Sequence, residues 1–76
     1  MHLSEVKNGS TVIVQKIEES ALRVKLMEMG IVEDKSLTIL FRAPFGDPIA
    51  IDVDGYVLSL RLDEAGLIVV KPKIIV

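Results

Sequence analysis

Few side chains in this 76-residue sequence could do chemistry, because it contains one histidine and no cysteine. The lack of cysteine excludes disulfides, thiolate zinc sites, iron–sulfur clusters and cysteine nucleophiles. His2 lies next to the start of the chain, where we expect a solvated and mobile side chain rather than a general base or a metal ligand. Serine hydroxyls occur in no context typical of a nucleophile, namely at Ser10, Ser20, Ser36 and Ser59. No catalytic triad can be assembled, so we do not expect an enzyme.

Two carboxylates, those of Asp52 and Asp54, could hold a hard cation, because residues two apart on a strand share one face. Calcium and magnesium take roughly six oxygen ligands, however, and no calcium-binding loop surrounds this pair. A glycine-rich phosphate loop is also missing, because Gly46 and Gly55 are isolated. We therefore expect a polar strand face here, and the sequence predicts neither a metal nor another cofactor.

The charge balance argues against nucleic acid as a partner. Nine lysines and arginines stand against eleven aspartates and glutamates, which gives a net charge of −2 and no basic stripe for phosphates. No apolar run reaches the roughly 18 residues that a membrane-spanning helix needs. Residues 1–7 have neither the basic lead nor the apolar run of a secretion signal. We expect a cytoplasmic protein that binds no nucleic acid and does not insert into a membrane.

Any functional side chain must be positioned by short strands that are joined by tight turns. Residues 43–49 predict a stiff hairpin tip near the middle of the chain. Pro44 and Pro48 fix φ and lack an amide donor, so neither suits a central strand. Gly46 and Asp47 tolerate the positive φ of a tight reversal. Alternating or β-branched apolar residues predict five strands, at residues 11–17, 36–41, 49–53, 56–61 and 67–70.

One helix is predicted between the first two strands, over residues 21–29. Ser20 is a good N-cap, and Gly30 supplies a left-handed stop. At 100° per residue, one apolar stripe should face the core. This stripe consists of Leu22, Leu26 and Met29.

The helix carries apolar residues on a second side as well. Val24 and Met27 project from the side where a surface helix normally carries polar groups. We interpret them as a partner-binding surface with charged neighbours at its rim, and the hairpin tip as a second shaped surface. The candidate interface residues are Arg23, Val24, Met27 and Glu28 on the helix, and Phe45 and Asp47 on the tip.

Shorter elements are predicted near both ends of the chain. Residues 3–6 predict a helical turn with Ser4 as its N-cap. A second helical turn, over residues 62–66 and ended by Gly66, precedes the last strand. Pro72 should interrupt that strand, and residues 73–76 then form an apolar tail that could add a strand along a sheet edge.

Five short strands and one helix predict a mainly β fold. We expect a small SH3-like barrel of about five antiparallel strands that closes on itself, with one short α-helix between the first and second long strands. An OB-type barrel is the nearest alternative. Residues 1–76 should form a single domain, because a chain of this length supports one modest core.

Several motifs follow one another in a distinctive order. They are Lys25-Leu26-Met27-Glu28-Met29-Gly30-Ile31, Pro44-x-Gly46-Asp47-Pro48-Ile49, Gly55-Tyr56-x-Leu58-x-Leu60-Arg61, Glu64-Ala65 and Ile68-x-Val70. This combination covers nearly the whole chain and resembles the FeoA family, ferrous iron transport protein A. The resemblance implies an SH3-like barrel that serves as a small cytoplasmic accessory of the FeoB membrane transporter, whose cytoplasmic part binds GTP.

The resemblance also implies how such a protein works. It would bind no iron itself, but would dock on the transporter and modulate its assembly, nucleotide cycle or gating. The barrel pattern equally resembles the SH3-like domain at the end of iron-dependent repressors, so a stand-alone regulatory module of that kind is the alternative. No helix-turn-helix segment is present in the 76 residues, so such a module would act in trans. The apolar surplus permits a homo-oligomer in either case.

Overall fold

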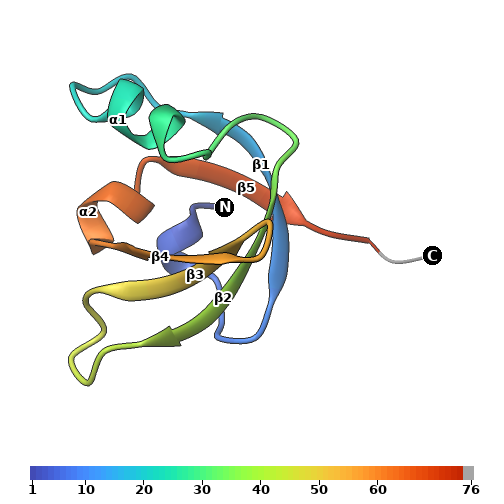
Figure 1. Cartoon of the computed structure of the whole chain (residues 1–76), viewed down its shortest axis with the longest axis vertical. Coiled ribbons are helices and arrows are strands. Elements are labelled where there is room, and N and C mark those ends of the chain that lie inside the picture. Colours follow the sequence, from blue (N-terminus) through green and yellow to red (C-terminus); the bar gives the residue numbers. More distant parts are fainter. Residues whose placement is uncertain (75–76) are drawn as a thin grey trace.

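The computed structural model describes residues 1–74, which form one antiparallel sheet with short helices on its concave side (Figure 1). The strand order in the sheet is β4-β3-β2-β1-β5. The elements are η1 (Leu3–Glu5), β1 (Thr11–Ile17), α1 (Arg23–Glu28), β2 (Ser36–Arg42), β3 (Ile49–Val53), β4 (Tyr56–Leu60), α2 (Leu62–Ala65) and β5 (Ile68–Pro72). The expected mainly β architecture is confirmed, with five strands and α1 between the first two.

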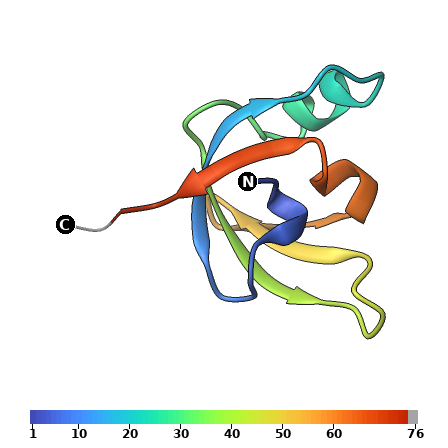
Figure 2. The ribbon, with the colours of Figure 1, turned by 180° about the vertical axis from the view of Figure 1, so that it is seen from behind.

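The sheet is strongly curved, as the views from both sides show (Figures 1 and 2). Register shifts in β1 between Val14 and Lys16, and in β2 between Ile39 and Phe41, mark the positions where bulges bend the strands. The outer strands β4 and β5 do not pair with each other within residues 1–74, so strand pairing does not close the expected barrel. Packed helical segments occupy the open side instead, where α2 and η1 contact one another.

One continuous hydrophobic cluster fills the concave side, and every strand and helix contributes to it. On β3, Ile49, Ile51 and Val53 belong to this cluster as predicted, and Asp52 between them is half-exposed. Ala50 departs from the predicted alternation, because it is buried as well. The buried members are Leu3, Val6, Val12, Val14, Ile17, Leu26, Ile31, Leu37, Ile39, Ile49, Ile51, Val53, Leu60, Ala65, Ile68 and Val70.

Both predicted hairpin turns are confirmed. Asp54 and Gly55 have φ values of 49° and 92°, which match a two-residue turn with positive φ at both positions. At the tip, the Ala43 N–H donates to the Pro48 carbonyl over 3.0 Å. Gly46 takes a φ of 85°. The two turns therefore align β2, β3 and β4 as consecutive antiparallel neighbours.

Helix α1 is shorter than predicted. It has six residues and begins after Leu22, because the two residues that follow Ser20 form a turn. Ser20 still contributes, since its Oγ accepts the Leu22 N–H over 3.1 Å. Only Leu26 of the predicted stripe is fully buried, whereas Leu22 and Met29 are half-buried. The predicted left-handed stop at Gly30 is confirmed by its φ of 94°.

One prediction near the end of the chain is wrong and another is confirmed. Pro72 does not interrupt the last strand but is its final residue, opposite Val12, because β5 is an edge strand and needs no donor on its outer side. Gly66 ends α2 as predicted, with a φ of −66°. A Cβ at Gly66 would lie 3.3 Å from the Leu62 carbonyl oxygen, which is a tight contact. Of the predicted tail strand, residues 73 and 74 are not in a strand, and residues 75–76 lie outside the described part.

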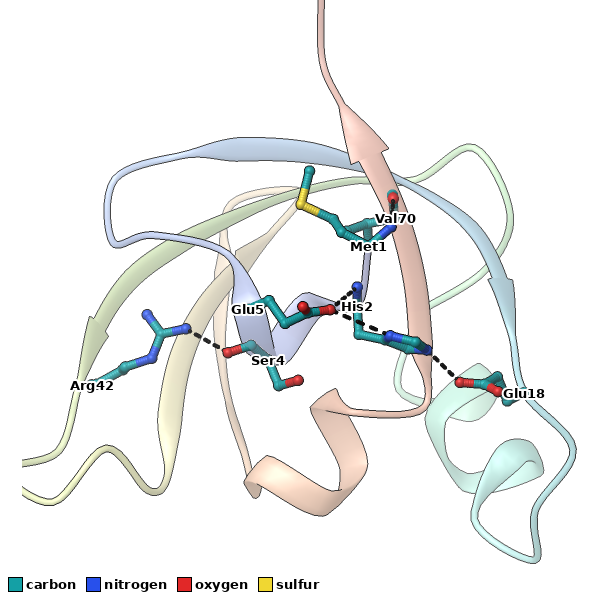
Figure 3. Close-up of polar contacts among 7 residues, drawn as sticks. All are labelled: Met1, His2, Ser4, Glu5, Glu18, Arg42 and Val70. Carbon is teal, nitrogen blue, oxygen red and sulfur yellow. Dashed lines mark hydrogen bonds and ion pairs between the residues drawn. The ribbon is translucent and has the colours of Figure 1, made fainter.

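The predictions for the first residues are also corrected. The turn η1 begins at Leu3 with His2 as its N-cap, so Ser4 lies inside the turn. The His2 side chain has partners, because its ring lies between two carboxylates (Figure 3). Its Nε2 lies 2.5 Å from Oε1 of Glu18, and its Nδ1 lies 3.4 Å from Oε1 of Glu5. The first residues therefore join the sheet rather than extend into solvent.

Candidate functional site

Asp54, one of the two carboxylates considered for a cation site, has a structural partner. Asp54 lies in the β3–β4 turn, where its Oδ2 accepts a hydrogen bond from Lys35 Nζ over 2.5 Å. This bond raises the pKa of Lys35. In residues 1–74, no three His, Asp or Glu side chains gather in a group that could hold a metal ion.

The predicted interface residues of α1 lie on one outer surface. Val24 and Met27 are exposed, at 64% and 46% of their surface. Met27 borders a small hollow of about 140 Å³, whose floor contains Ile17 and Ile31. We call this hollow, together with the exposed side of α1, the α1 surface. Charged residues rim the hollow, namely Lys16, Arg23 and Glu33.

Phe45 and Asp47, the other two predicted interface residues, lie on the β2–β3 tip. Figure 1 shows this tip and α1 at opposite ends of the molecule, so the structure does not unite the six residues in one surface. The Phe45 ring is 98% exposed. Asp47 has a structural partner, because its Oδ1 accepts the Leu62 N–H over 3.1 Å at the start of α2.

A third region lies between α1 and the tip, and sequence reasoning missed it. It is a polar pocket of about 490 Å³. Glu64 is its buried carboxylate, with an exposed fraction of 6%. Oε1 of Glu64 accepts the Arg61 N–H over 3.0 Å, and Oε2 accepts Lys25 Nζ over 2.9 Å. The residues that line the polar pocket are Lys25, Asp47, Pro48, Ser59, Arg61 and Glu64.

Hydrogen bonding gives Glu64 an unusual electrostatic environment. The Arg61 N–H and then the Lys25 ammonium lower the pKa of the Glu64 carboxyl, while burial acts in the opposite direction. One sequence signal could have indicated part of this arrangement, because a glutamate three residues after a helix N-cap often binds back to the cap N–H. No local signal indicates the bond from Lys25, which lies 39 residues away.

The lowered pKa predicts a pH dependence of stability. A carboxyl whose pKa is lower when folded adds stability above its ordinary pKa of 4.5, and this stability is lost as the pH falls through the lower folded value. We expect the wild type to exceed Glu64→Gln in free energy of unfolding at pH 7, by an amount that shrinks below pH 4.5. Urea unfolding of both proteins from pH 7 to pH 3 measures this. A difference that does not change with pH would contradict the assignment.

A hydrogen bond from a β4 side chain to the backbone joins the end of α1 to β4. The Tyr56 hydroxyl donates to the Met29 carbonyl over 3.0 Å, immediately before the left-handed Gly30. A Cβ at Gly30 would lie 2.5 Å from this hydroxyl oxygen. The φ of Gly30 therefore favours glycine, and an added Cβ would also push the Tyr56 hydroxyl away from the Met29 carbonyl.

Replacement of Gly30 by alanine should destabilise the protein. The left-handed backbone alone costs a non-glycine residue about 1–2 kcal/mol, and the new methyl group also displaces Tyr56 from Met29. Gly9→Ala is the matched control, because Gly9 has a similar φ of 87° but no atom within 4 Å of an added Cβ. In thermal or urea unfolding, Gly30→Ala should lose more stability than Gly9→Ala. Equal losses would mean that the Tyr56 contact contributes nothing.

Comparison with known proteins identifies the family. The FeoA domain model matches residues 1–72. The chain belongs to the FeoA domain family. Over 72 residues it is 33% identical to the "Fe(2+) transport protein A/Fe(2+) transporter FeoB fusion protein" of Porphyromonas gingivalis, a match that covers 93% of this chain. The chain spans only about 8% of the length of that fusion protein.

Solved structures of FeoA proteins have the same fold. An FeoA-like protein from Clostridium acetobutylicum is 45% identical, with a TM-score of 0.92 over 97% of this chain and 87% of its own. The zinc complex of Stenotrophomonas maltophilia FeoA, described as an SH3 domain protein, is 26% identical with a TM-score of 0.83. That match covers 93% of this chain and 89% of the relative. The predicted family and SH3-like fold are thus confirmed.

The likeness to metal-dependent repressors is also present. A manganese-dependent transcriptional repressor is 25% identical with a TM-score of 0.86, and the match covers 95% of this chain but 36% of the repressor. The FeoA fold therefore resembles one part of such repressors. Within residues 1–74, no helix is long and apolar enough to cross a membrane.

Proposed function

We propose that this protein is a cytoplasmic accessory of ferrous iron uptake that docks on an FeoB-type transporter and modulates its assembly, nucleotide cycle or gating. The observation that carries this proposal is the FeoA–FeoB fusion of the Porphyromonas gingivalis relative. Fusion holds two domains at a high effective concentration, which favours pairs that work in contact. The Stenotrophomonas maltophilia relative, proposed as a ferrous iron transport activating factor, supports the same role.

In this role the protein acts only by binding, as a single domain over residues 1–76, and it catalyses no reaction. A docked domain alters a transporter only if it binds one state more tightly than another. We therefore expect its affinity for the cytoplasmic GTP-binding part of FeoB to depend on the bound nucleotide. The protein by itself should neither hydrolyse GTP nor bind ferrous iron tightly.

The α1 surface is the docking surface that we propose. Val24 and Met27 are exposed apolar side chains of α1, and Met27 borders a hollow that can receive an apolar side chain of the partner. Arg23 lies at the rim and already pairs with Glu19 over 2.5 Å. Glu28, Phe45 and Asp47 are proposed as further contacts outside the hollow.

The first experiment is a titration of the isotope-labelled protein with the cytoplasmic part of the cognate transporter, with and without guanine nucleotide. Localised amide shifts on α1 would support both the partner and the surface. Shifts confined to the tip would move the surface but keep the partner. Absence of shifts with both the cytoplasmic and the membrane part of the transporter would refute the proposed function.

A charge at Met27 should weaken this binding without unfolding the protein. Met27→Glu places a carboxylate at the edge of the hollow, where a docked apolar side chain would desolvate it, so we expect a loss of about tenfold or more in affinity. Val57→Glu is the matched control, because Val57 is 61% exposed on β4 and lies outside the hollow. Equal effects of the two substitutions, or unfolding of Met27→Glu, would remove the α1 surface from the proposal.

The likeness to the repressor supports a second candidate function. A stand-alone SH3-like module could bind an iron-dependent repressor in trans, since its fold matches part of a related repressor. The same titration with a cognate repressor in place of the transporter separates the two candidates. We propose no nucleic-acid partner and no membrane insertion in either case, and sedimentation of the free protein tests for a homo-oligomer.

A further inference from the structure

The carboxylates of the polar pocket already accept hydrogen bonds from other groups of this protein. Oδ1 of Asp47 accepts the N–H of Leu62, and both oxygens of Glu64 accept hydrogen bonds, from the Arg61 N–H and from Lys25. These bonds start α2 and tie it to the hairpin tip and to α1. The pocket is therefore held together by its anionic groups.

The hydrogen-bond donors of the polar pocket have fewer partners within the described residues. Among the described residues, no hydrogen bond or ion pair is made by the Arg61 guanidinium or by the Ser59 hydroxyl. The Arg61 charge is nevertheless close enough to Glu64 to help lower its pKa. Lys25 uses one donor on Glu64, and its side chain remains 61% exposed. The open bonding capacity of the pocket thus consists of two cations and one hydroxyl.

We propose that this pocket receives an aspartate or glutamate side chain of the protein partner, with Arg61 as its main ligand. A guanidinium offers two parallel N–H groups that match the two oxygens of a carboxylate, and Lys25 and Ser59 add further donors. A phosphate dianion fits less well, because Asp47 and Glu64 would repel its second charge. The pocket lies at β4, an edge strand, so a partner segment can reach it from the open side of the sheet.

This inference rests on the proposed docking to the transporter and adds the chemistry that the partner must present. The α1 surface binds an apolar side chain, and the pocket binds an acidic one. The two regions are neighbours, because Lys25 lines the pocket and belongs to α1. A partner segment with one acidic and one apolar residue would engage both regions.

Substitution of Arg61 tests the inference in the complex. Arg61→Gln should weaken binding to the cytoplasmic part of the transporter about tenfold, and Arg61→Lys should weaken it less, since lysine keeps the charge but not the planar fork. Arg61→Lys should unfold at the wild-type temperature, because it keeps the charge near Glu64 and the Arg61 side chain bonds to no described residue. Arg61→Gln should remain folded, with at most a small loss from the missing charge. Lys71→Gln, an exposed cation on β5, controls for the change in net charge. Equal effects of Arg61→Gln and Lys71→Gln would overturn the proposal.

A second test needs no transporter. N-acetyl-glutamate-N′-methylamide, titrated into the labelled wild type, should shift the Arg61 side-chain N–H signal and the Ser59 amide. In Arg61→Gln the Ser59 amide should not shift. Inorganic phosphate should produce smaller shifts at the same sites. Larger shifts with phosphate, or no difference between wild type and Arg61→Gln, would refute a carboxylate site. Shifts with the glutamate derivative together with no binding of the transporter would keep the pocket and refute the proposed function.

Discussion

Replacement of Leu26 by alanine should lower the free energy of unfolding by about 2–5 kcal/mol. Leu26 is the one side chain of α1 that is fully buried, with an exposed fraction of 0%. The substitution leaves a cavity where the helix meets the core. A domain of this length has a total stability of roughly 4–11 kcal/mol, so the loss is a large share of it.

The control for this prediction is Leu26→Met, which conserves volume and should cost less than about 1.5 kcal/mol. Urea unfolding followed by circular dichroism measures both variants. Because Val24 and Met27 are held in place by the same short helix, Leu26→Ala should also weaken partner binding more than Leu26→Met does. A loss below about 1 kcal/mol for Leu26→Ala would show that other contacts fix α1 on the sheet.

Arg42→Ala should have the second largest effect, a loss of about 1.5–3 kcal/mol. The guanidinium of this β2 residue donates from Nη2 to the carbonyl oxygens of Ser4 and Val6, over 3.1 and 2.6 Å. Its Nη1 also reaches Oδ1 of Asn8. One side chain thus satisfies three acceptors of the segment that leads from η1 to β1, and Figure 3 shows the contact with Ser4. Removal of Arg42 leaves these half-buried carbonyls without a donor.

The loss should be local at first, so hydrogen exchange of the Val6 amide, which bonds to the Leu3 carbonyl, should accelerate before global unfolding. Arg23→Ala is the matched control, because the Arg23 pair with Glu19 is exposed and such pairs contribute less than about 1 kcal/mol. Arg42→Lys should recover only part of the stability, since lysine cannot span three acceptors. Similar losses in Arg42→Ala and Arg23→Ala would mean that the N-terminal segment is held by Leu3 and Val6 alone.

Features encoded within a few residues were predicted well. The first strand, Thr11–Ile17, has the predicted bounds, because a β-branched run between turn residues leaves few alternatives. Asp54-Gly55 and Gly30 take the predicted positive φ values, since each is required by a local steric preference. The family motifs are equally local, and the match to the FeoA domain confirmed them.

Predictions that ignored neighbours in space failed. Ser4 is a good N-cap by type, yet the N-cap is His2, two residues earlier, whose N–H donates to Oε1 of Glu5. Proline normally interrupts a strand, but Pro72 lies in the edge strand β5, where its missing N–H costs no hydrogen bond of the sheet. At Pro72 the tertiary setting overrode a valid local preference.

The sequence by itself determined the strands, the turns, the presence of one helix and the family. Only the tertiary structure decided which side chains meet. It separates the tip from the α1 surface, and it brings Lys25 to Glu64 across 39 residues and Arg42 to Ser4 across 38. Such contacts depend on strand register and on the curvature of the sheet, which the whole core sets together. A local sequence pattern does not predict these contacts, because periodicity and turn preferences extend over only a few residues.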